Sequence, residues 1–144
     1  MVEKVHISWD EFHHDVKMLA AKIKASGEYD KIIAISRGGL LPAGIISYEL
    51  DIRNTQAVNI SSYDGDSQRK PEDVKVDILN VGVVDFRTLI IDDLSDTGAT
   101  FRLLRQMFPQ GRFASVYAKP KGSAYVDIYA RDIPDKWIVF PWDI

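Results

Sequence analysis

The sequence predicts an α/β fold in which a mostly parallel central sheet is flanked by helices. Short apolar runs rich in β-branched residues alternate along the chain with segments whose apolar residues recur at helical spacing. Two of these runs also end in a loop, one rich in glycine and one acidic, that leads directly into a predicted helix. The 144 residues are the size of one domain, so we expect residues 1–144 to form a single unit.

The chain begins with a predicted amphipathic helix. Ser8 or Asp10 can cap its start, and Gly27 is placed to end it. Between these residues the apolar side chains recur at helical spacing, which predicts one core-facing side made of Phe12, Val16, Leu19, Ala20 and Ile23.

A strand, a glycine loop and a second helix follow. Residues 31–36 are apolar and β-rich, Arg37-Gly38-Gly39 closes them, and residues 40–50 read as a buried helix with Pro42 in its first turn. Residues 56–61 predict another strand. Residues 62–85 carry Gly, Pro and mixed charge, and long loops in compact domains commonly cover a site. We therefore expect a flexible lid there, part of which forms a hairpin.

The second half predicts another unit of strand, loop and helix. Residues 88–91 form an apolar strand, and the helix that opens near residue 100 carries Phe101, Leu104 and Phe108. Three further runs predict strands at 113–118, 126–130 and 137–140. In a sheet of this kind, ligands bind beyond the carboxyl ends of the strands.

Composition excludes several kinds of function. The chain has 18 basic and 21 acidic side chains and a formal net charge of −3, so it has no overall positive field and we expect no nucleic-acid partner. The absence of cysteine excludes disulfides and thiolate metal sites. We see no signal peptide or membrane span and expect a cytoplasmic protein. His6, His13 and His14 have no partner at metal-ligand spacing.

The sharpest local signal is LIIDDLSDTGAT, residues 89–100. The strand brings Asp92 and Asp93 to the carboxyl edge of the sheet, a tight turn follows, and residues 97–100 open a helix. The first N–H groups of a helix have no internal partner, so they can bind a phosphate. Paired acids repel phosphate and suit a sugar diol or hydrated Mg²⁺. A phosphorylated sugar would satisfy both halves of the motif.

Other readings of this motif explain less. Helix capping accounts for one acid but not for three carboxylates within five residues. Phospho-receiver domains pair two acids with a later Lys-Pro, as in Lys119-Pro120, but their acids follow the first strand of the domain. Phosphate-loop ATPases carry Gly-Lys-Ser or Gly-Lys-Thr, which this chain lacks.

Two acids, an intervening pair and then Asp-Thr-Gly-x-Thr resemble the signature of the type I phosphoribosyltransferases. The chain is most similar to the bacterial xanthine-guanine branch of that family, through IAISRGGLLP, ISSYDGDSQR, LIIDDLSDTG, AKP and DIPDKWIVFPWD. The resemblance spans nearly the whole chain. It implies the type I phosphoribosyltransferase fold, with a small base-binding hood formed from the termini and residues 120–144.

The resemblance also implies a site for phosphoribosyl pyrophosphate. Ser36, Arg37 and Gly38 resemble the loop that binds pyrophosphate, where a guanidinium can pair two oxygens, and Arg69 resembles the lid arginine. Asp93 is implied to hold the expected cofactor, Mg²⁺. The residues implied to hold the ribose and its 5′-phosphate are Asp92, Asp93, Leu94, Ser95, Asp96, Thr97, Gly98, Ala99 and Thr100.

A purine subsite is implied beside it. Lys119 resembles the lysine that donates to the 6-oxygen of the purine, and an ammonium cannot accept, so 6-oxopurines are favoured over adenine. Trp137 resembles the aromatic residue that stacks on the base, and Ile138 the residue whose main chain meets its 2-position. Asp96 is implied to be the catalytic residue, which accepts or orients the imidazole proton of the base.

The family resemblance thus implies an enzyme of purine salvage that transfers 5-phosphoribose from phosphoribosyl pyrophosphate to guanine, xanthine or hypoxanthine and releases pyrophosphate. It also implies a homodimer or homotetramer. Two alternatives stay open: a non-catalytic regulator of the same fold that senses phosphoribosyl pyrophosphate or nucleotide, and a phosphoribosyltransferase for another base. Lys119 and Trp137 favour the purine enzyme.

Overall fold

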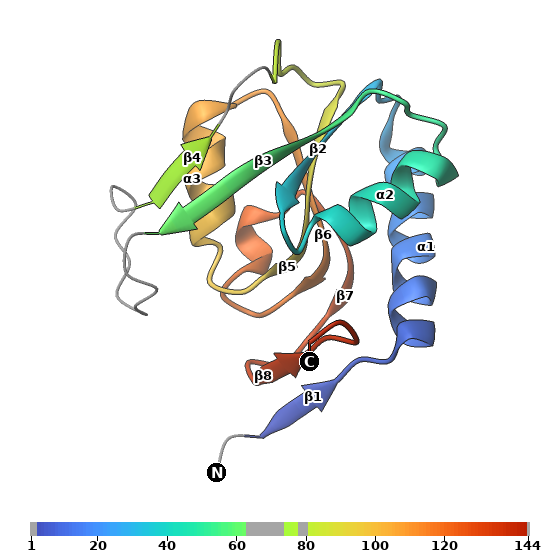
Figure 1. Ribbon diagram of the computed structural model, residues 1–144, viewed down its shortest axis with the longest axis vertical. Helices are drawn as coiled ribbons and strands as arrows, with labels where there is room; N and C mark the ends of the chain where they lie inside the picture. Colours follow the sequence, from blue (N-terminus) through green and yellow to red (C-terminus); the bar gives the residue numbers. More distant parts are fainter. Residues whose placement is uncertain (1–2, 63–73, 78–80, 144) are drawn as a thin grey trace.

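The computed structural model describes residues 3–62, 74–77 and 81–143 (Figure 1). Its centre is a six-stranded sheet with the order β4-β3-β2-β5-β6-β7. All neighbouring pairs are parallel except β3 and β4, which are antiparallel. The strands are β2 (Lys31–Ser36), β3 (Thr55–Ser62), β4 (Val74–Asp77), β5 (Thr88–Ser95), β6 (Arg112–Ala118) and β7 (Ile128–Asp132).

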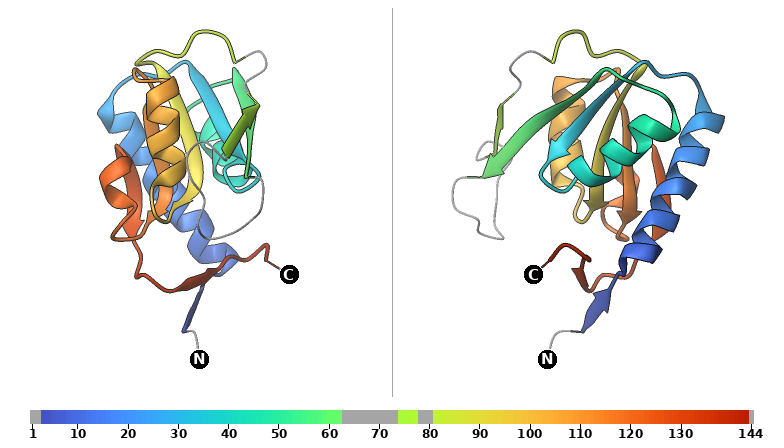
Figure 2. Two further views of the ribbon diagram at one scale, coloured as in Figure 1. Left: turned by 90° about the vertical axis from the view of Figure 1, so that its left-hand side faces the viewer. Right: turned by 45° about the vertical axis from the view of Figure 1, so that its right-hand side comes forward.

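Helices cover both faces of this sheet. Helix α1 (Trp9–Ser26) and helix α2 (Leu40–Glu49) lie on one face and α3 (Ala99–Met107) on the other (Figures 1 and 2). Side chains of β2 alternate accordingly, because Ile32 packs in the cluster with α1 whereas Ile33 packs with Phe101 of α3. The predicted α/β class, with a mostly parallel sheet between helices, is confirmed.

Helix α1 begins where the sequence indicated. Ser8 is the N-cap: the backbone N–H of Glu11 donates to its Oγ (3.1 Å), and Glu11 accepts from the backbone N–H of Ser8 (3.5 Å). Of the two predicted caps, the structure uses Ser8. The predicted core-facing residues are all buried.

Helix α2 is only half buried, which corrects the expectation of a buried helix. Pro42, Ala43 and Ile46 face the core, whereas Leu40, Leu41 and Tyr48 are exposed, Tyr48 to 90%. Apolar residues occur all round the helix predicted at residues 40–50, so the sequence does not indicate which side is exposed. Of the segment predicted as a lid with a hairpin, Val74–Asp77 form β4, which pairs antiparallel with the predicted strand β3 from Asn59↔Asp77 to Ser62↔Val74; residues 63–73 and 78–80 lie outside the described residues.

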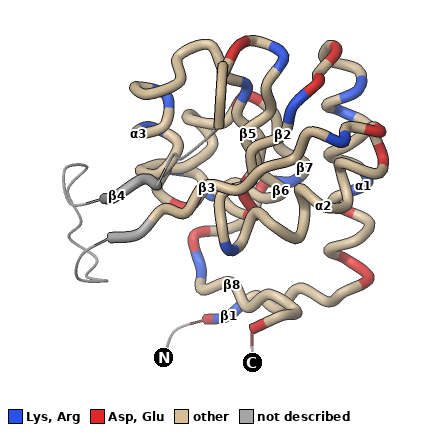
Figure 3. The backbone as a smooth tube through the Cα atoms, turned by 45° about the horizontal axis from the view of Figure 1, so that its top comes forward, with Lys and Arg blue, Asp and Glu red and all other residues tan. Residues whose placement is uncertain are grey.

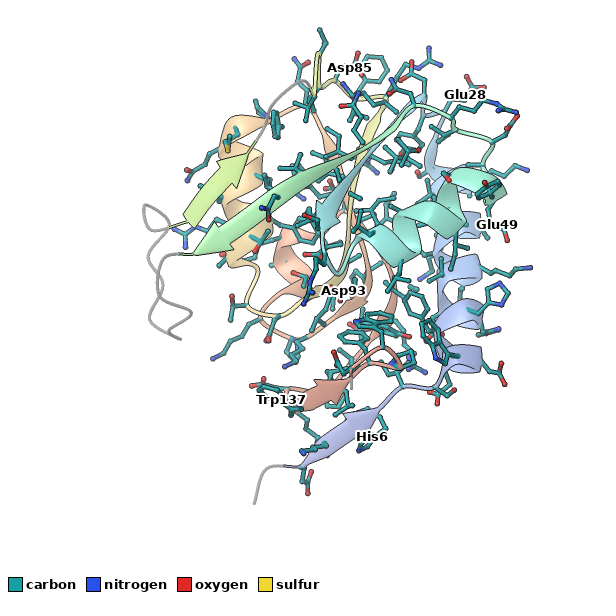
Figure 4. The ribbon with its side chains drawn as sticks, viewed as in Figure 1. His6, Glu28, Glu49, Asp85, Asp93 and Trp137 are labelled. Atoms are coloured by element: carbon teal, nitrogen blue, oxygen red, sulfur yellow. The ribbon has the colours of Figure 1, made fainter. Side chains whose placement is uncertain are left out.

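Both ends of the chain form a second sheet. β1 (Lys4–His6) pairs in parallel with β8 (Trp137–Val139), in the register Lys4↔Trp137. This sheet lies beyond the end of the central sheet at which Asp93 is placed (Figure 4). The strand at 137–140 was predicted, but it belongs to this separate sheet, and β1 was not predicted.

The remaining features add little to the site. A 3-10 helix (Ser123–Tyr125) precedes β7. Acidic and basic positions are interspersed along the chain (Figure 3). Among the residues described, no helix has the length and apolar character needed to cross a membrane.

Candidate functional site

Strand β5 continues through the acidic motif, so Asp92 and Asp93 lie within the strand rather than beyond it. Pairing with β2 stops at Ala34↔Ile91, but pairing with β6 continues to Ser95↔Ala118. The β6 ladder therefore holds the acids in extended backbone, which corrects the predicted end at residue 91. On the other side, β2 ends at Ser36, and the loop that follows lies next to Asp93.

The loop after β2 packs directly against these acids. A Cβ placed on Gly38 would lie 2.5 Å from Oδ2 of Asp93, and one on Gly39 would lie 2.7 Å from the carbonyl oxygen of Ile35. No side chain fits at either position, so the two glycines allow the loop to approach β5. The peptide bond between Ser36 and Arg37 is cis.

Within the described residues, the carboxyl groups of Asp92 and Asp93 have no positively charged partner. The backbone N–H of Asp93 donates to Oδ1 of Asp92 (2.8 Å), and neither carboxylate has a Lys or Arg within ion-pair distance in the described part of the chain. Burial raises the pKa of Asp92 well above its usual value, and the neighbouring charge of Asp93 raises it further. Burial also raises the pKa of Asp93. A bound cation or a set of hydroxyl donors would relieve this charge.

The turn that follows β5 is anchored to the protein at Ser95 and is exposed to solvent at the residues after it. Ser95 is buried, and its Oγ donates to the carbonyl oxygen of Gly122 (2.8 Å). Gly98 has φ of 86°, and a Cβ there would collide with the Tyr125 ring. Asp96, Thr97 and Ala99 are exposed. The start of α3 is therefore rigid and accessible to an incoming anion.

Two other residues of the acidic motif, Leu94 and Thr100, are partly buried. Leu94 is partly buried and packs on the core, and Thr100 is half-buried in the first turn of α3. The N–H of Ala99 donates to Oγ1 of Thr97 (3.3 Å). His6, His13 and His14 are all exposed.

Lys119 and Asp96 meet at one edge of this turn. Lys119 follows the last residue of β6 and is 8% exposed, and its Nζ lies 3.3 Å from Oδ1 of Asp96. Its backbone N–H donates to the carbonyl oxygen of Ser95 (3.0 Å), which ties the end of β6 to the end of β5. Two residues predicted to contact a base therefore lie side by side.

Trp137 and Ile138 lie on the sheet formed by the termini. Trp137 is 63% exposed and Ile138 is buried. The N–H of Trp137 donates to the carbonyl oxygen of Glu3 (3.3 Å). In Figure 4 Trp137 and Asp93 lie toward the same end of the molecule, whereas Glu28 and Asp85 lie at the opposite end. Arg69 falls outside the described residues.

Sequence reasoning missed Asp143. A cleft of about 910 Å³ is lined by the loop after β2, the start of α2, Asp93 and the carboxyl-terminal segment, through Arg37, Gly38, Leu40, Leu41, Asp93, Phe140, Trp142 and Asp143. The N–H of Phe140 donates to Oδ2 of Asp143 (2.8 Å), which fixes that carboxylate in a turn. No spacing in the sequence relates residue 143 to residue 93, because only the return of the chain brings them to one cleft.

The acids of the site fit a metal that is shared with a ligand. Among residues 3–62, 74–77 and 81–143, no three His, Cys, Asp or Glu side chains form a metal-binding group by themselves. Two carboxylates, Asp93 and Asp143, nevertheless line the cleft together with Arg37. Mg²⁺ commonly takes one or two carboxylates from the protein and its other ligands from phosphates and water, so this donor set fits Mg²⁺ bound with an anionic substrate.

Known proteins resemble this chain over almost its whole length. The phosphoribosyl transferase domain family matches residues 8–144. The xanthine-guanine phosphoribosyltransferase of Nitratidesulfovibrio vulgaris strain Hildenborough is 44% identical over 138 residues, which are 95% of this chain and 83% of that protein. The enzyme of the same name from Cereibacter sphaeroides is 40% identical over 144 residues, 96% of this chain and 86% of that protein. The crystal structure of a purine phosphoribosyltransferase from Pyrococcus horikoshii is 30% identical with a TM-score of 0.82, and the match covers 98% of this chain and 95% of that one.

Proposed function

This chain belongs to the phosphoribosyl transferase domain family and is a purine phosphoribosyltransferase, and from this premise we propose that it makes purine nucleotides by salvage. The reaction transfers 5-phosphoribose from phosphoribosyl pyrophosphate to guanine, xanthine or hypoxanthine and releases pyrophosphate. The observation that carries the proposal is the exposed turn at the start of α3, which adjoins two partly buried carboxylates that no Lys or Arg of the described residues neutralises. These are the complementary groups for a sugar phosphate.

We propose that the turn binds the 5′-phosphate of the sugar. Amide groups at the start of α3 and the hydroxyls of Thr97 and Thr100 supply donors, and Gly98 keeps the backbone free of side-chain bulk. Asp92 accepts from the ribose hydroxyls. Because Ser95 anchors the turn to Gly122, these groups are in place before the substrate arrives, which favours reaction by positioning.

The pyrophosphate is proposed to lie along the cleft. Arg37 and Gly38 line one wall, and the guanidinium of Arg37 can pair two oxygens. Ser36, the residue before them, is proposed to bind the same group. Arg69 would reach the same group from the lid. Asp93 would hold Mg²⁺ with Asp143 as a second ligand, and the bound ion would neutralise charge on the leaving pyrophosphate.

The base is proposed to bind between the turn and the terminal sheet. Lys119 donates to the 6-oxygen, the exposed ring of Trp137 stacks on the purine, and the main chain of Ile138 meets the 2-position. Asp96 accepts the imidazole proton as the ring nitrogen attacks the anomeric carbon. In the absence of a base, Asp96 and Lys119 form an ion pair with each other. A bound purine would replace this contact, with Lys119 donating to its 6-oxygen and Asp96 accepting its proton.

We further propose a homodimer or homotetramer in the cytoplasm. The ring of Tyr48 on α2, which is 90% exposed, supports association because a second copy would cover it. Light scattering during size-exclusion chromatography tests the oligomeric state.

The assignment is tested by mixing the protein with phosphoribosyl pyrophosphate, Mg²⁺ and one free base at a time, and detecting mononucleotide by chromatography. We expect product with guanine, xanthine or hypoxanthine and little with adenine or uracil. Binding of phosphoribosyl pyrophosphate without product from any base would favour a regulator. Product from a pyrimidine alone would contradict the base assignment.

A further inference from the structure

A buried hydrogen bond joins α1 to β6, the strand that ends directly before Lys119. The Tyr117 hydroxyl donates to Oδ2 of Asp15 (2.7 Å), and both residues are at most 2% exposed. Nη2 of Arg131 lies 3.4 Å from the same carboxylate oxygen, and its Cζ lies 5.4 Å from the centre of the Tyr117 ring. The hydroxyl end and one side of the Tyr117 ring are therefore held by charged groups.

Another side of the ring supports the carboxyl-terminal segment. The rings of Tyr117 and Phe140 have centroids 6.0 Å apart, and Phe140 stacks on Trp142 at 4.7 Å with an interplanar angle of 4°. Trp142 in turn meets Phe12 edge-on at 4.9 Å. Because Phe12 and Asp15 both belong to α1, these contacts form a closed circuit that links α1, β6 and the carboxyl-terminal segment.

These contacts involve residues next to both parts of the proposed purine subsite, Lys119 after β6 and Ile138 on the terminal sheet. Tyr117 is two residues before Lys119 on β6, and Phe140 is two residues after Ile138. Phe140 and Trp142 also line the cleft that contains Asp93. A displacement of the Tyr117 ring would therefore move the support of the terminal segment relative to β6.

We propose that Asp15 and Tyr117 are positioning residues for the purine subsite, because their hydrogen bond fixes the ring on which Phe140 and the terminal segment rest. The inference depends on the proposed function, since it assigns these residues to the base and not to phosphoribosyl pyrophosphate. Phenylalanine could supply the same ring surface. Only tyrosine supplies in addition the buried donor that Asp15 requires.

The test compares steady-state kinetics of Tyr117→Phe with the wild type in the full chain. Loss of the hydrogen bond should raise the KM for guanine about three- to tenfold, while binding of phosphoribosyl pyrophosphate, most of whose proposed contacts lie outside the terminal segment, weakens by a clearly smaller factor. Asp15→Ala removes the acceptor of the same bond, so its KM for guanine should rise as in Tyr117→Phe. Tyr129→Phe is the matched control, because the Tyr129 hydroxyl donates to Oδ1 of Asp132 (2.9 Å) at the surface of the neighbouring strand.

Each outcome separates the two proposals. Nucleotide formation by the wild type with an unchanged guanine KM in Tyr117→Phe would overturn this inference alone. An equal loss of affinity for guanine and phosphoribosyl pyrophosphate would also overturn it, since it would mean that the bond is structural only. Failure of the wild type to make nucleotide from any oxopurine overturns the proposed function, and this inference with it. If Tyr117→Phe does not fold, Phe140→Leu removes the other ring of the contact and should raise the guanine KM in the same way.

Discussion

Asp96 and Lys119 come from different elements and form an ion pair at the edge of the α3 turn, with 3.3 Å between Nζ and Oδ1. Lys119 is nearly buried, whereas the Asp96 side chain is 57% exposed. The exposed partner can therefore exchange the lysine for a ligand at small cost, because pairs open to solvent contribute little. This asymmetry suits a carboxylate that must accept a proton from a bound base.

We predict that Asp96→Asn lowers kcat by about 10²–10⁴-fold, since an amide cannot accept the proton. The dissociation constant of phosphoribosyl pyrophosphate should change little, because the phosphate donors of the turn remain. Single-turnover assays and calorimetry measure the two quantities separately. Asp135→Asn removes a carboxylate at an exposed position near the terminal sheet and serves as the control. Equal activity of the Asp96 variant would refute the catalytic role.

The raised pKa values of Asp92 and Asp93 also affect stability. Between the ordinary pKa, about 3.9, and the higher folded value, the folded protein binds more protons than the unfolded chain. The stability associated with these protons is present at low pH and is lost as pH rises through the folded pKa. The site therefore destabilises the free protein at neutral pH.

Asp92→Asn should therefore increase the free energy of unfolding at neutral pH and raise Tm by about 2–4 °C for each kcal/mol of that increase. Below a pH of about 4 the increase in Tm should be smaller. Calorimetry of the free protein over this pH range measures the difference between variant and wild type. A difference that grows as pH falls would mean that the carboxylates are stabilised by partners in the folded state.

At the scale of elements, the contact between the β2 loop and β5 depends on Gly38. A Cβ at Gly38 would lie 2.5–2.7 Å from the three atoms of the Asp93 carboxyl group, whereas a Cβ at Gly44 in α2 meets nothing within 4 Å. The two glycines lie only six positions apart, but they have opposite tolerance for a methyl group.

Gly38→Ala should therefore lower kcat/KM for phosphoribosyl pyrophosphate by at least about tenfold, because loop and carboxylate must separate. Gly44→Ala should keep activity and stabilise the protein by about 0.5–1 kcal/mol, since alanine favours a helix interior over glycine. Activity assays and thermal unfolding of both variants give the comparison. An active Gly38→Ala enzyme would show that the loop moves freely from β5.

Elements with strong local patterns were predictable from the sequence. The caps and apolar side of α1, and the acidic run into α3, depend on neighbours along the chain. β1 was missed because three residues with one apolar member carry no pattern, and its pairing with Trp137 comes from the opposite end of the chain. β7 begins at Ile128, two residues later than predicted, because Ser123–Tyr125 first forms a 3-10 helix. The position of Asp143 depends likewise on tertiary structure alone.

At the scale of the whole molecule, the proposed site divides between two sheets. Apart from Asp143, the described residues proposed for the sugar and its phosphates lie on loops and strands of the central sheet, whereas Trp137 and Ile138 lie on the sheet that joins the two ends of the chain. The terminal sheet is held by the N–H of Ile7, which donates to the carbonyl oxygen of Val139 (2.9 Å), and by an ion pair of Lys136 with Glu3 (2.6 Å).

This division predicts that the two substrates can be uncoupled by deleting residues 2–6. Without β1, the strand β8 loses its only partner among the described residues, so Trp137 and Ile138 lose their register, and the KM for guanine should rise at least about tenfold. The dissociation constant of phosphoribosyl pyrophosphate should rise by a clearly smaller factor, because its proposed contacts other than Asp143 belong to the central sheet. Lys136→Gln is the control: it removes only an exposed ion pair worth about 0–1 kcal/mol and should leave both constants nearly unchanged. If the deletion weakened the binding of both substrates equally, the terminal strands would support the central sheet as well, and the base subsite would not be a separate part of the molecule.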